Sequence, residues 1–235
     1  MNNPTHDNRS RKCFYVFAIV VAFVMTGRYV WTTGHRAALS TQCHCRIFEL
    51  ASAIYLYEAQ YGTLPPRVVY KDGVPMHSWR VLLLESTDRQ LFNEYRLDEP
   101  WNSPHNLSLA DRRPAVYACP EISDPDEPFH TSYTAVISPR PLLRDGQTLK
   151  SIRDPENVLM IVETKRTDIH WMSPEDISIE DLSSDVLLHD IIGGHHEDGG
   201  KAAVVTGEIV PVGDLTLADF VKKCSVPVPV PSRSR

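Results

Sequence analysis

Four consecutive side chains near the carboxyl end of the sequence could together bind a metal ion. The stretch LLHDIIGGHHEDGGKAAVVTGEIVPV, residues 187–212, contains His195, His196, Glu197 and Asp198, and imidazole and carboxylate groups are common ligands of transition metals. The stretch lacks the H-E-x-x-H spacing that zinc peptidases carry on a helix. Glycine pairs on both sides are typical of a connector. Two interpretations remain, a metal site and a solvated loop between strands, and the glycines favour the loop.

The cysteines are the second group of residues that could do chemistry. One of the five, Cys13, lies in an apolar run, and four lie beyond it: Cys43, Cys45, Cys119 and Cys224. An even number of cysteines in an exported domain is typical of disulfide bonds, and four cysteines allow three pairings. Cys43 and Cys45 face different directions on a helix, which makes a zinc site built from Cys43, His44 and Cys45 unfavourable.

Motifs for other kinds of catalysis are absent from the sequence. There is no G-x-S-x-G nucleophile motif and no phosphate-binding loop. Acidic side chains gather in proline-rich segments, where charge usually marks a solvated surface. The formal net charge of −6 offers no basic excess of the kind that binds nucleic acid. We therefore expect a protein that is not an enzyme, needs no cofactor and has no nucleic-acid partner.

An apolar run near the amino terminus is the first element that the sequence predicts. Residues 13–27, CFYVFAIVVAFVMTG, carry no charge, and the run continues past Arg28 to Gly34. A bilayer-spanning helix needs about 20 apolar residues, and a long arginine side chain can reach the headgroups from within such a helix. The sequence therefore predicts a single membrane-spanning helix over residues 13–34.

The charges before this run set its expected orientation. Arg9, Arg11 and Lys12 precede it, and positive charge is enriched on the cytosolic side of membrane helices. Residues 1–12 would then form a cytosolic tail, and residues 35–224 a domain outside the cytoplasmic (inner) membrane. No small-x-small cleavage site follows the run, so we expect a retained anchor with the lipid bilayer as its partner.

The helix is expected to continue beyond the membrane. Apolar residues recur every three or four positions, in one narrow stripe of an α-helix: Leu39, Cys43, Ile47, Leu50, Ile54, Tyr57 and Tyr61. Gly62 and the pair Pro65-Pro66 would end it. The sequence thus predicts one helix from about residue 13 to residue 61, whose second half lies on a soluble domain.

Short segments rich in valine, isoleucine and tyrosine are expected to form strands. They are PAVYACP (114–120), SYTAVIS (132–138), NVLMIVET (157–164), KAAVV (201–205) and EIVPV (208–212). Residues 72–97 are predicted to form a turn and one or two short helices, and residues 215–224 a short closing helix or strand. The tail, residues 225–235, has alternating prolines and is expected to be disordered. The predicted fold class is α+β, with one long helix laid across an antiparallel sheet.

This layout resembles that of type IV pilins and of the pseudopilins of type II secretion. Several segments follow the order found in a large bacterial family of prepilin-like proteins, domain-of-unknown-function family 1559: TQCHCRIFELASAIYLYEAQYGTLPP, SWRVLLLE, LFNEYRLDEPWNSPHN, VYACPE, TSYTAVISP, NVLMIVET and WMSPEDI. The resemblance covers roughly residues 37–212 and implies a pilin-like fold.

The most specific element of the resemblance is a carboxy-terminal H-x(9)-D-G pattern. His196 and the pair Thr206-Gly207 keep its spacing, with Thr206 in place of the family's aspartate. The resemblance implies a hairpin here. Threonine is a poor residue for positive φ, so a tight type I′ turn is not expected, and a longer loop or a type II turn with Gly207 remains open.

The chain departs from the family at the export signal. Signals of the family resemble G-F-T-L-I-E, with cleavage after the glycine and a glutamate at the fifth mature position, whereas this chain reads RKCFYVFAIVV. The absence of both residues argues against processing by prepilin peptidase. It also argues against assembly into a filament through that glutamate.

The resemblance also implies roles for individual residues. Cys43 and Cys119 match family positions, which implies a bond between them and leaves Cys45 to pair with Cys224. Two further family positions are expected to be structural, at the edge of the sheet: Glu163 and Trp171.

A leading function and an alternative follow from these observations. The leading one is a non-enzymatic, membrane-anchored, pseudopilin-like protein that presents an interaction surface outside the membrane, with envelope or secretion proteins as partners. The alternative is a metal- or glycan-binding module that uses the loop around His195 and His196. A bound ion that is lost when His196 is changed would favour the alternative.

Overall fold

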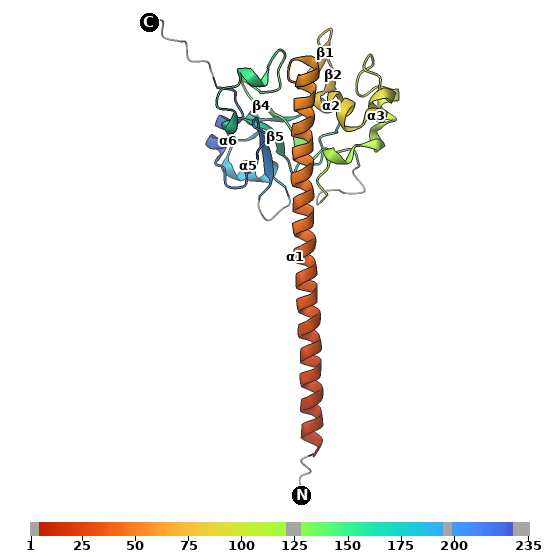
Figure 1. Ribbon diagram of the computed structural model, residues 1–235, viewed down its shortest axis with the longest axis vertical. Coiled ribbons are helices and arrows are strands. Elements are labelled where there is room, and N and C mark those ends of the chain that lie inside the picture. The colour runs from red at the N-terminus through yellow and green to blue at the C-terminus, as the bar shows by residue number, and fades with distance from the viewer. Residues whose placement is uncertain (1–4, 121–127, 195–198, 228–235) are drawn as a thin grey trace, which may run out of the picture. The chain divides into compact units, whose positions relative to one another are not determined.

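The computed structural model describes residues 5–120, 128–194 and 199–227, and the chain divides into two compact units, Met1–Thr41 and Gln42–Arg235. The helices are α1 (Thr5–Tyr61), α2 (Trp79–Thr87), α3 (Arg89–Glu94), α4 (Pro104–Leu107), α5 (Asp185–Ile191) and α6 (Leu217–Lys223) (Figure 1). The strands are β1 (Val68–Lys71), β2 (Val74–Ser78), β3 (Tyr133–Thr134), β4 (Val136–Ile137), β5 (Leu159–Glu163), β6 (Ile177–Ser178), β7 (Lys201–Val204) and β8 (Ile209–Pro211). Single-turn 3-10 helices lie between them: η1 (Ala110–Arg112), η2 (Ala115–Tyr117), η3 (Leu149–Ser151), η4 (Pro155–Asn157) and η5 (Ile179–Asp181).

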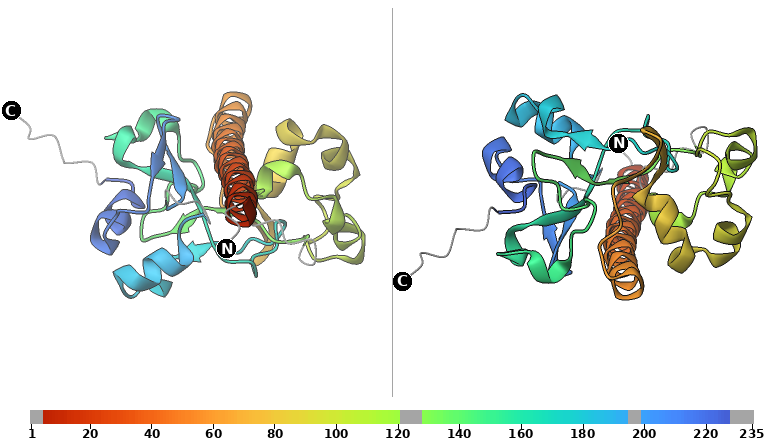
Figure 2. Two further views of the ribbon diagram at one scale, coloured as in Figure 1. Left: turned by 90° about the horizontal axis from the view of Figure 1, so that it is seen from below. Right: turned by 90° about the horizontal axis from the view of Figure 1, so that it is seen from above.

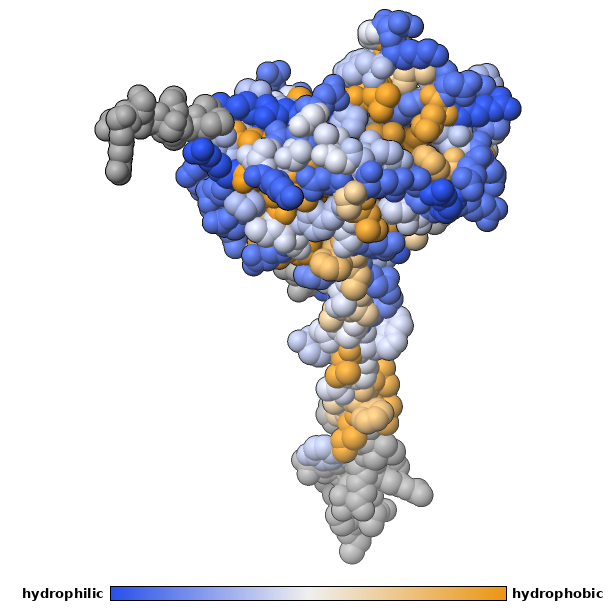
Figure 3. Space-filling model, turned by 45° about the horizontal axis from the view of Figure 1, so that its top comes forward, coloured by the Kyte–Doolittle hydropathy of each residue, from blue (hydrophilic) through white to orange (hydrophobic). Residues whose placement is uncertain are grey.

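The first unit is the amino-terminal part of α1, and the helix begins at Thr5, earlier than predicted. Among the described residues, α1 is the one helix long and apolar enough to cross a membrane, and none of its apolar window is buried within the structure. Large apolar side chains are exposed along it (Figure 3): Tyr15, Phe17, Ile19, Val20, Val21, Phe23, Val24, Met25, Tyr29, Val30 and Trp31. An exposed apolar surface of this extent is what a lipid-facing helix presents.

Polar side chains within this stretch are satisfied by the helix itself. The Thr26 hydroxyl donates to the carbonyl of Ala22 at 2.9 Å, and the Thr33 hydroxyl donates to that of Tyr29 at 2.9 Å. A threonine that bonds to its own helix can face an apolar environment without an unpaired donor. The threonines are therefore compatible with the predicted span over residues 13–34.

In the second unit, α1 carries the predicted apolar stripe into the core. Its central positions are completely buried: Cys43, Ile47, Leu50 and Ile54. Farther along the stripe, Tyr57 is partly buried and Tyr61 is 50% exposed. The helix ends at Gly62, as predicted, because Gly62 has a φ of +79° and donates its N–H to the carbonyl of Glu58 at 2.8 Å.

The main sheet has the strand order β3-β5-β7-β8 and is antiparallel throughout. Its register places Tyr133 opposite Glu163 and Ala202 opposite Val210. Every residue of β5 is buried, because residues 42–61 of α1 cover one face of the sheet while α5 and α6 cover the other (Figure 2). The α+β, pilin-like fold class is confirmed, and α6 confirms the closing element predicted over residues 215–224 as a helix, whereas α5 was not predicted.

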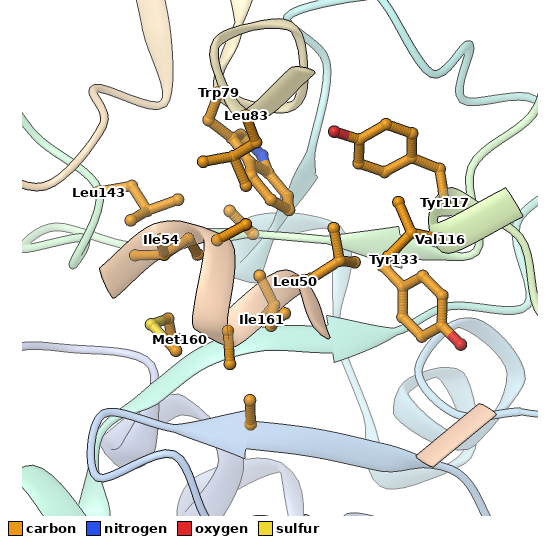
Figure 4. Packing of buried hydrophobic residues seen from close by; sticks show 14 of the residues in the cluster. Leu50, Ile54, Trp79, Leu83, Val116, Tyr117, Tyr133, Leu143, Met160 and Ile161 are labelled. Carbon is orange, nitrogen blue, oxygen red and sulfur yellow. The ribbon is translucent and has the colours of Figure 1, made fainter. Parts of the chain in front are cut away.

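The core on the α1 side joins the helix to two other elements. Leu50 and Ile54 pack with Trp79 and Leu83 of α2 on one side of α1 and with Ile161 of β5 on the other (Figure 4). The helix therefore packs between two elements of its unit, while another part of its surface, with Phe48 and Leu56, is exposed. Replacing a completely buried leucine by alanine in such a core typically costs about 2–5 kcal/mol.

Two predicted segments are different in the structure. Residues 114–120 were expected to form a strand but contain the 3-10 helix η2, which begins directly after Pro114. Residues 72–78, expected to form a turn before α2, belong to the hairpin β1–β2. Asp72 and Gly73 at its tip have φ values of 52° and 78°, which is the signature of a type I′ turn. A small parallel pair, β4 with β6, also departs from the all-antiparallel prediction.

Candidate functional site

A disulfide bond fastens α1 to the rest of the second unit. Cys43 and Cys119 are bonded, with their Cα atoms 5.4 Å apart, and both are completely buried. The N–H of Cys119 donates to the hydroxyl of Ser132 at 2.8 Å, and the Tyr133 hydroxyl donates to the carbonyl of Cys43 at 3.4 Å. The prediction of this bond is confirmed. It links two segments that lie 76 residues apart in the sequence.

The carboxylate of Glu163 lies beside this bond. Ligand atoms of Cys43, Cys119 and Glu163 all lie within 4.8 Å of one another. A metal would need the two sulfurs as thiolates, and in the bonded state neither is available. The cluster is therefore a structural one in the oxidised protein.

The second predicted disulfide, Cys45–Cys224, is wrong. Cys45 is an exposed free thiol and Cys224 is a buried one. Because Cys45 follows Cys43 by two positions on a helix, it faces solvent when Cys43 faces the core. Cys224 ends α6 and packs in the cluster on the other face of the sheet. Burial raises the pKa of its thiol, so it is held as a neutral SH group.

The candidate metal residues His195, His196, Glu197 and Asp198 lie outside the described residues, and the expectation that they bind metal stays untested. The ends of this loop are described. A Cβ on Gly200 would lie 2.2 Å from the N atom of Gly194, and one on Gly193 would lie 2.7 Å from the carbonyl oxygen of Gly199. The two ends therefore pass so closely that only glycine fits there.

Glu163 fastens both ends of this loop. Its carbonyl accepts from the N–H of Gly193 at 2.9 Å, and its carboxylate accepts from the N–H of Lys201 at 2.7 Å. The residue is completely buried at the end of β5. These contacts give Glu163 a structural part at the point where the loop leaves the sheet.

The carboxy-terminal hairpin contains the motif residues Thr206 and Gly207. The N–H of Gly207 donates to the carbonyl of Val204 at 2.9 Å, and the N–H of Val204 donates to the carbonyl of Glu208 at 3.0 Å. Gly207 has a φ of +86°, whereas Thr206 has a negative φ. This is the longer loop that the sequence left open, with the glycine in the left-handed position that follows a type I turn.

Tyr55 of α1 supports this turn from the core side. Its hydroxyl donates to the carbonyl of Val205 at 2.9 Å, and a Cβ on Gly207 would lie 2.9 Å from the same hydroxyl. Only glycine fits this position, for two reasons: its φ is positive, and a Cβ would be too close to the Tyr55 side chain. Val205 and Gly207 thus hold the hairpin against Tyr55 of α1, whereas Thr206 is exposed.

A fully buried ion pair lies at the junction of several segments. The Arg80 guanidinium and the Asp176 carboxylate are 2.7 Å apart, and neither side chain is exposed. Arg80 also donates to the carbonyls of Trp171, Ser173 and Glu175, at 3.1, 3.1 and 2.6 Å. These bonds occupy most of the five donors of an arginine. The side chain therefore has a structural role.

Asp176 receives bonds from two further elements. Its carboxylate accepts from the indole N–H of Trp79 at 3.3 Å and from the backbone N–H of Ala135 at 3.1 Å. The segments SWRVLLLE, TSYTAVISP and WMSPEDI, which lie far apart in the sequence, meet at this one carboxylate. The signal for this buried pair in the sequence is a lone arginine inside the apolar run WRVLLL, which needs a buried acidic partner.

Comparison with known proteins gives one match. The model of a family described as "Protein of unknown function (DUF1559)" matches residues 35–158. The chain belongs to the DUF1559 family. No curated protein and no solved structure matches it.

The DUF1559 match includes the second half of α1, the disulfide and Arg80. It ends before Glu163 and before the carboxy-terminal motif. The motif is therefore described by the structure alone, through Gly207 and its contact with Tyr55.

Two histidines, His77 in the part matched by the DUF1559 model and His170 just beyond it, have lowered pKa values. His77 is buried and contacts the Tyr95 hydroxyl at 3.0 Å and the carbonyl of Leu97 at 2.9 Å, and burial lowers its pKa. His170 stacks between Phe129 and Trp171, with ring centroids 5.8 and 6.5 Å away. Burial, and then the charge of Arg80, lowers the pKa of His170 to about 4.

Trp171, expected to be structural, is completely buried next to this stack. Its ring lies parallel to that of Tyr117 at 5.8 Å, and its indole N–H donates to the carbonyl of Ala110 at 2.9 Å. The tryptophan thereby joins the η1 and η2 region to the segment around Asp176. Its position is in the core rather than at the edge of the sheet.

Proposed function

We propose that this DUF1559 protein is a non-enzymatic, membrane-anchored, pilin-like protein whose globular unit presents an interaction surface outside the cytoplasmic membrane. The observation that carries the proposal is the continuous helix α1. The predicted span exposes large apolar side chains, threonines that bond to their own helix and Arg28, and the apolar stripe of the later part is buried in a core. One helix thus supplies both an anchor and the centre of the domain.

The disulfide supports placement outside the cytosol. Bonds such as Cys43–Cys119 form and persist in oxidising compartments and are rare in the bacterial cytosol. The basic residues Arg9, Arg11 and Lys12 ahead of the apolar run agree with this orientation. Both arguments support the proposal that the Gln42–Arg235 unit lies outside the cytosol.

The polar groups of the described core support a non-enzymatic role. Arg80 and the Oδ1 atom of Asp176 are hydrogen-bonded to each other and to the backbone. The Asn106 side chain is also buried and bonds to the backbone of Arg96 through both its oxygen and its nitrogen, at 3.0 Å each. A catalytic group has to meet a substrate, and these groups already have partners inside the protein. We infer that the lipid bilayer is one partner and that envelope or secretion proteins are others.

Membrane extraction tests the anchor. Val20→Asp with Val24→Asp places two carboxylates in the apolar run, each of which costs ~2.5–3.5 kcal/mol at the centre of a membrane helix. We expect the wild-type protein to stay in the membrane fraction in alkaline carbonate and the double variant to become extractable. Thr41→Asp with Gln42→Asp, at exposed positions beyond the predicted span, is the matched control and should stay in the membrane. Extraction of the wild-type protein would refute the anchor.

A further inference from the structure

The arginines that the structure describes in the second unit differ in their burial and in whether a carboxylate lies close to them. Six have a carboxylate within ion-pair distance: Arg67, Arg80, Arg89, Arg96, Arg112 and Arg166. Arg46 and Arg113 are both partly buried, and neither forms an ion pair with any residue that the structure describes. Burial without a counter-charge is unfavourable for a guanidinium, which sets these two apart from the rest.

The Arg46 and Arg113 side chains bond to two backbone segments that are hydrogen-bonded to each other. Arg46 of α1 donates through Nη1 to the carbonyl of Ala118, and Arg113, just after η1, donates through Nη1 to that of His130. The segments that carry these two carbonyls are joined, because the N–H of Ser132 donates to the carbonyl of Tyr117 at 2.8 Å. The two guanidinium groups are therefore neighbours next to the Cys43–Cys119 bond.

Most N–H donors of the Arg46 and Arg113 guanidinium groups have no acceptor among the residues that the structure describes. A guanidinium carries five N–H donors, and each of these two has one hydrogen bond to the protein that the structure describes. Burial lowers the pKa of Arg113, and the positive charge of Arg46 lowers it further. Two like charges held together in a partly desolvated place attract an anion, because it supplies both the missing charge and the missing acceptors.

We propose that Arg46 and Arg113 form a binding site for an oxyanion, carried by a phosphate, sulfate or carboxylate group. Planar guanidinium groups suit such oxygens, since each can donate two parallel bonds. The site is set by α1, η1 and the disulfide-linked segment, so it is preformed in the oxidised protein. It does not depend on membrane topology, and it would stand if the protein proved not to be anchored.

Ligand-induced stabilisation of the full-length protein in detergent tests the site. Inorganic phosphate, sulfate and citrate are each compared with sodium chloride at equal ionic strength, which removes general screening. At tenfold the dissociation constant, the bound anion should raise the Tm by ~4 °C for a chain of this size. Arg46→Gln with Arg113→Gln should abolish the rise. The three probes separate the ligand sources: the tetrahedral ions stand for phosphate or sulfate groups and citrate stands for carboxylates.

Two control variants make the result specific. Arg140→Gln removes an arginine that also donates to a backbone carbonyl, that of Val226, and should respond to the anions like the wild type. Arg46→Lys and Arg113→Lys keep the charge and should keep part of the response if a glutamine variant fails to fold. All variants are checked for the Cys43–Cys119 bond by non-reducing peptide mapping.

Several results would overturn the proposal. One is an equal Tm shift in chloride, and another is an unchanged anion response in the Arg46→Gln, Arg113→Gln variant. A third involves the acidic residues of segment 121–127, which lies outside the described residues. If anions bind only after Glu121→Gln, Asp124→Asn, Asp126→Asn and Glu127→Gln are introduced together, the chain's own carboxylates fill the site and no external ligand is needed.

Discussion

Arg80 and Asp176 are held in a place without water, where each charge depends on the other. Their attraction has to offset the loss of hydration, and it does so only with additional hydrogen bonds to the same groups. The carbonyls of Trp171, Ser173 and Glu175 and the N–H groups of Trp79 and Ala135 supply these bonds. Removing one partner leaves the other as an isolated buried charge, which is far less favourable than losing both.

The first prediction tests this dependence. Asp176→Asn should lower the free energy of unfolding by ~3–5 kcal/mol, because the Arg80 charge then lacks its counter-charge. Arg80→Met with Asp176→Asn should cost less than the sum of the single changes. Arg96→Gln breaks an exposed pair with Glu99 and should cost no more than ~1 kcal/mol. Urea unfolding followed by circular dichroism measures all four. A loss below about 1 kcal/mol in Asp176→Asn would contradict the structural role.

His170 makes stability depend on pH in a defined window. Its folded pKa of about 4 lies below the ordinary value of 6.5, so the unfolded chain binds the proton more readily. The stabilisation is therefore complete above pH 6.5 and is lost as the pH falls from there toward 4. Because the side chain is partly exposed, we discount the full linkage energy to roughly 1–2 kcal/mol.

The second prediction follows from this loss of stability at low pH. His170→Asn keeps an acceptor for the N–H of Met172 but does not titrate, so its stability should fall less between pH 6.5 and 4 than that of the wild type. His44→Asn, at an exposed position of α1, should leave the wild-type pH profile unchanged. Urea midpoints across this range measure the difference. Parallel profiles for the wild type and His170→Asn would show that the proton binds elsewhere.

At the scale of elements, the sequence carries strong signals wherever one physical pattern dominates. The stripe through Cys43, Ile47, Leu50 and Ile54 has a helical period, and these residues are buried on α1 as predicted. Segments such as KAAVV are β-strands because their apolar side chains fit a sheet that is covered on both faces. Such locally encoded features could be predicted from the sequence, and the family resemblance added the Cys43–Cys119 bond.

The elements that were not predicted from the sequence depend on contacts between distant segments or on the chemistry of a turn. Asp72-Gly73 is a strong hairpin signal, and it was interpreted as a turn alone. Residues 114–120 have the composition of a strand, but Tyr117 is placed by its stack on Trp171 and by its hydroxyl bond to the carbonyl of Arg80. Pairing Cys45 with Cys224 ignored that the two cysteines lie on different elements with different burial. Tertiary contacts decide such cases.

The third prediction concerns the cross-link between two elements. The Cys43–Cys119 bond closes a loop of 76 residues, for which the chain-entropy model gives ~4 kcal/mol of stabilisation. Cys43→Ser should lower the free energy of unfolding by about this amount, and adding Cys119→Ser should cost little more, since both remove one bond. Cys45→Ser, at an exposed free thiol, should change it by less than ~0.5 kcal/mol. Equal losses for Cys43→Ser and Cys45→Ser would contradict the pairing.

At the scale of the whole molecule, one helix has two environments to satisfy. Large apolar side chains from Phe17 to Trp31 are exposed in the first unit, whereas the stripe from Cys43 to Ile54 is buried in the second. Exposure of so much apolar surface to water is unfavourable, so the first stretch suits a membrane environment. Under the proposed anchoring, the exposed thiol of Cys45, at the start of the second unit, reports which side of the membrane that unit occupies.

The last prediction uses this native thiol to determine topology. Cys45 is exposed and free, Cys224 is buried with a raised pKa, Cys43 and Cys119 are bonded, and Cys13 lies in the predicted membrane span and is replaced by serine in every variant. Cys45 should therefore react first with a maleimide. A membrane-impermeant maleimide added to right-side-out spheroplasts should label the wild type at Cys45. Cys45→Ser should lose this label, whereas Cys224→Ser should keep it. In inside-out vesicles the same reagent should leave Cys45 unlabelled until detergent opens the membrane. Labelling in the vesicles but not in the spheroplasts would place the second unit in the cytosol and overturn the proposed orientation.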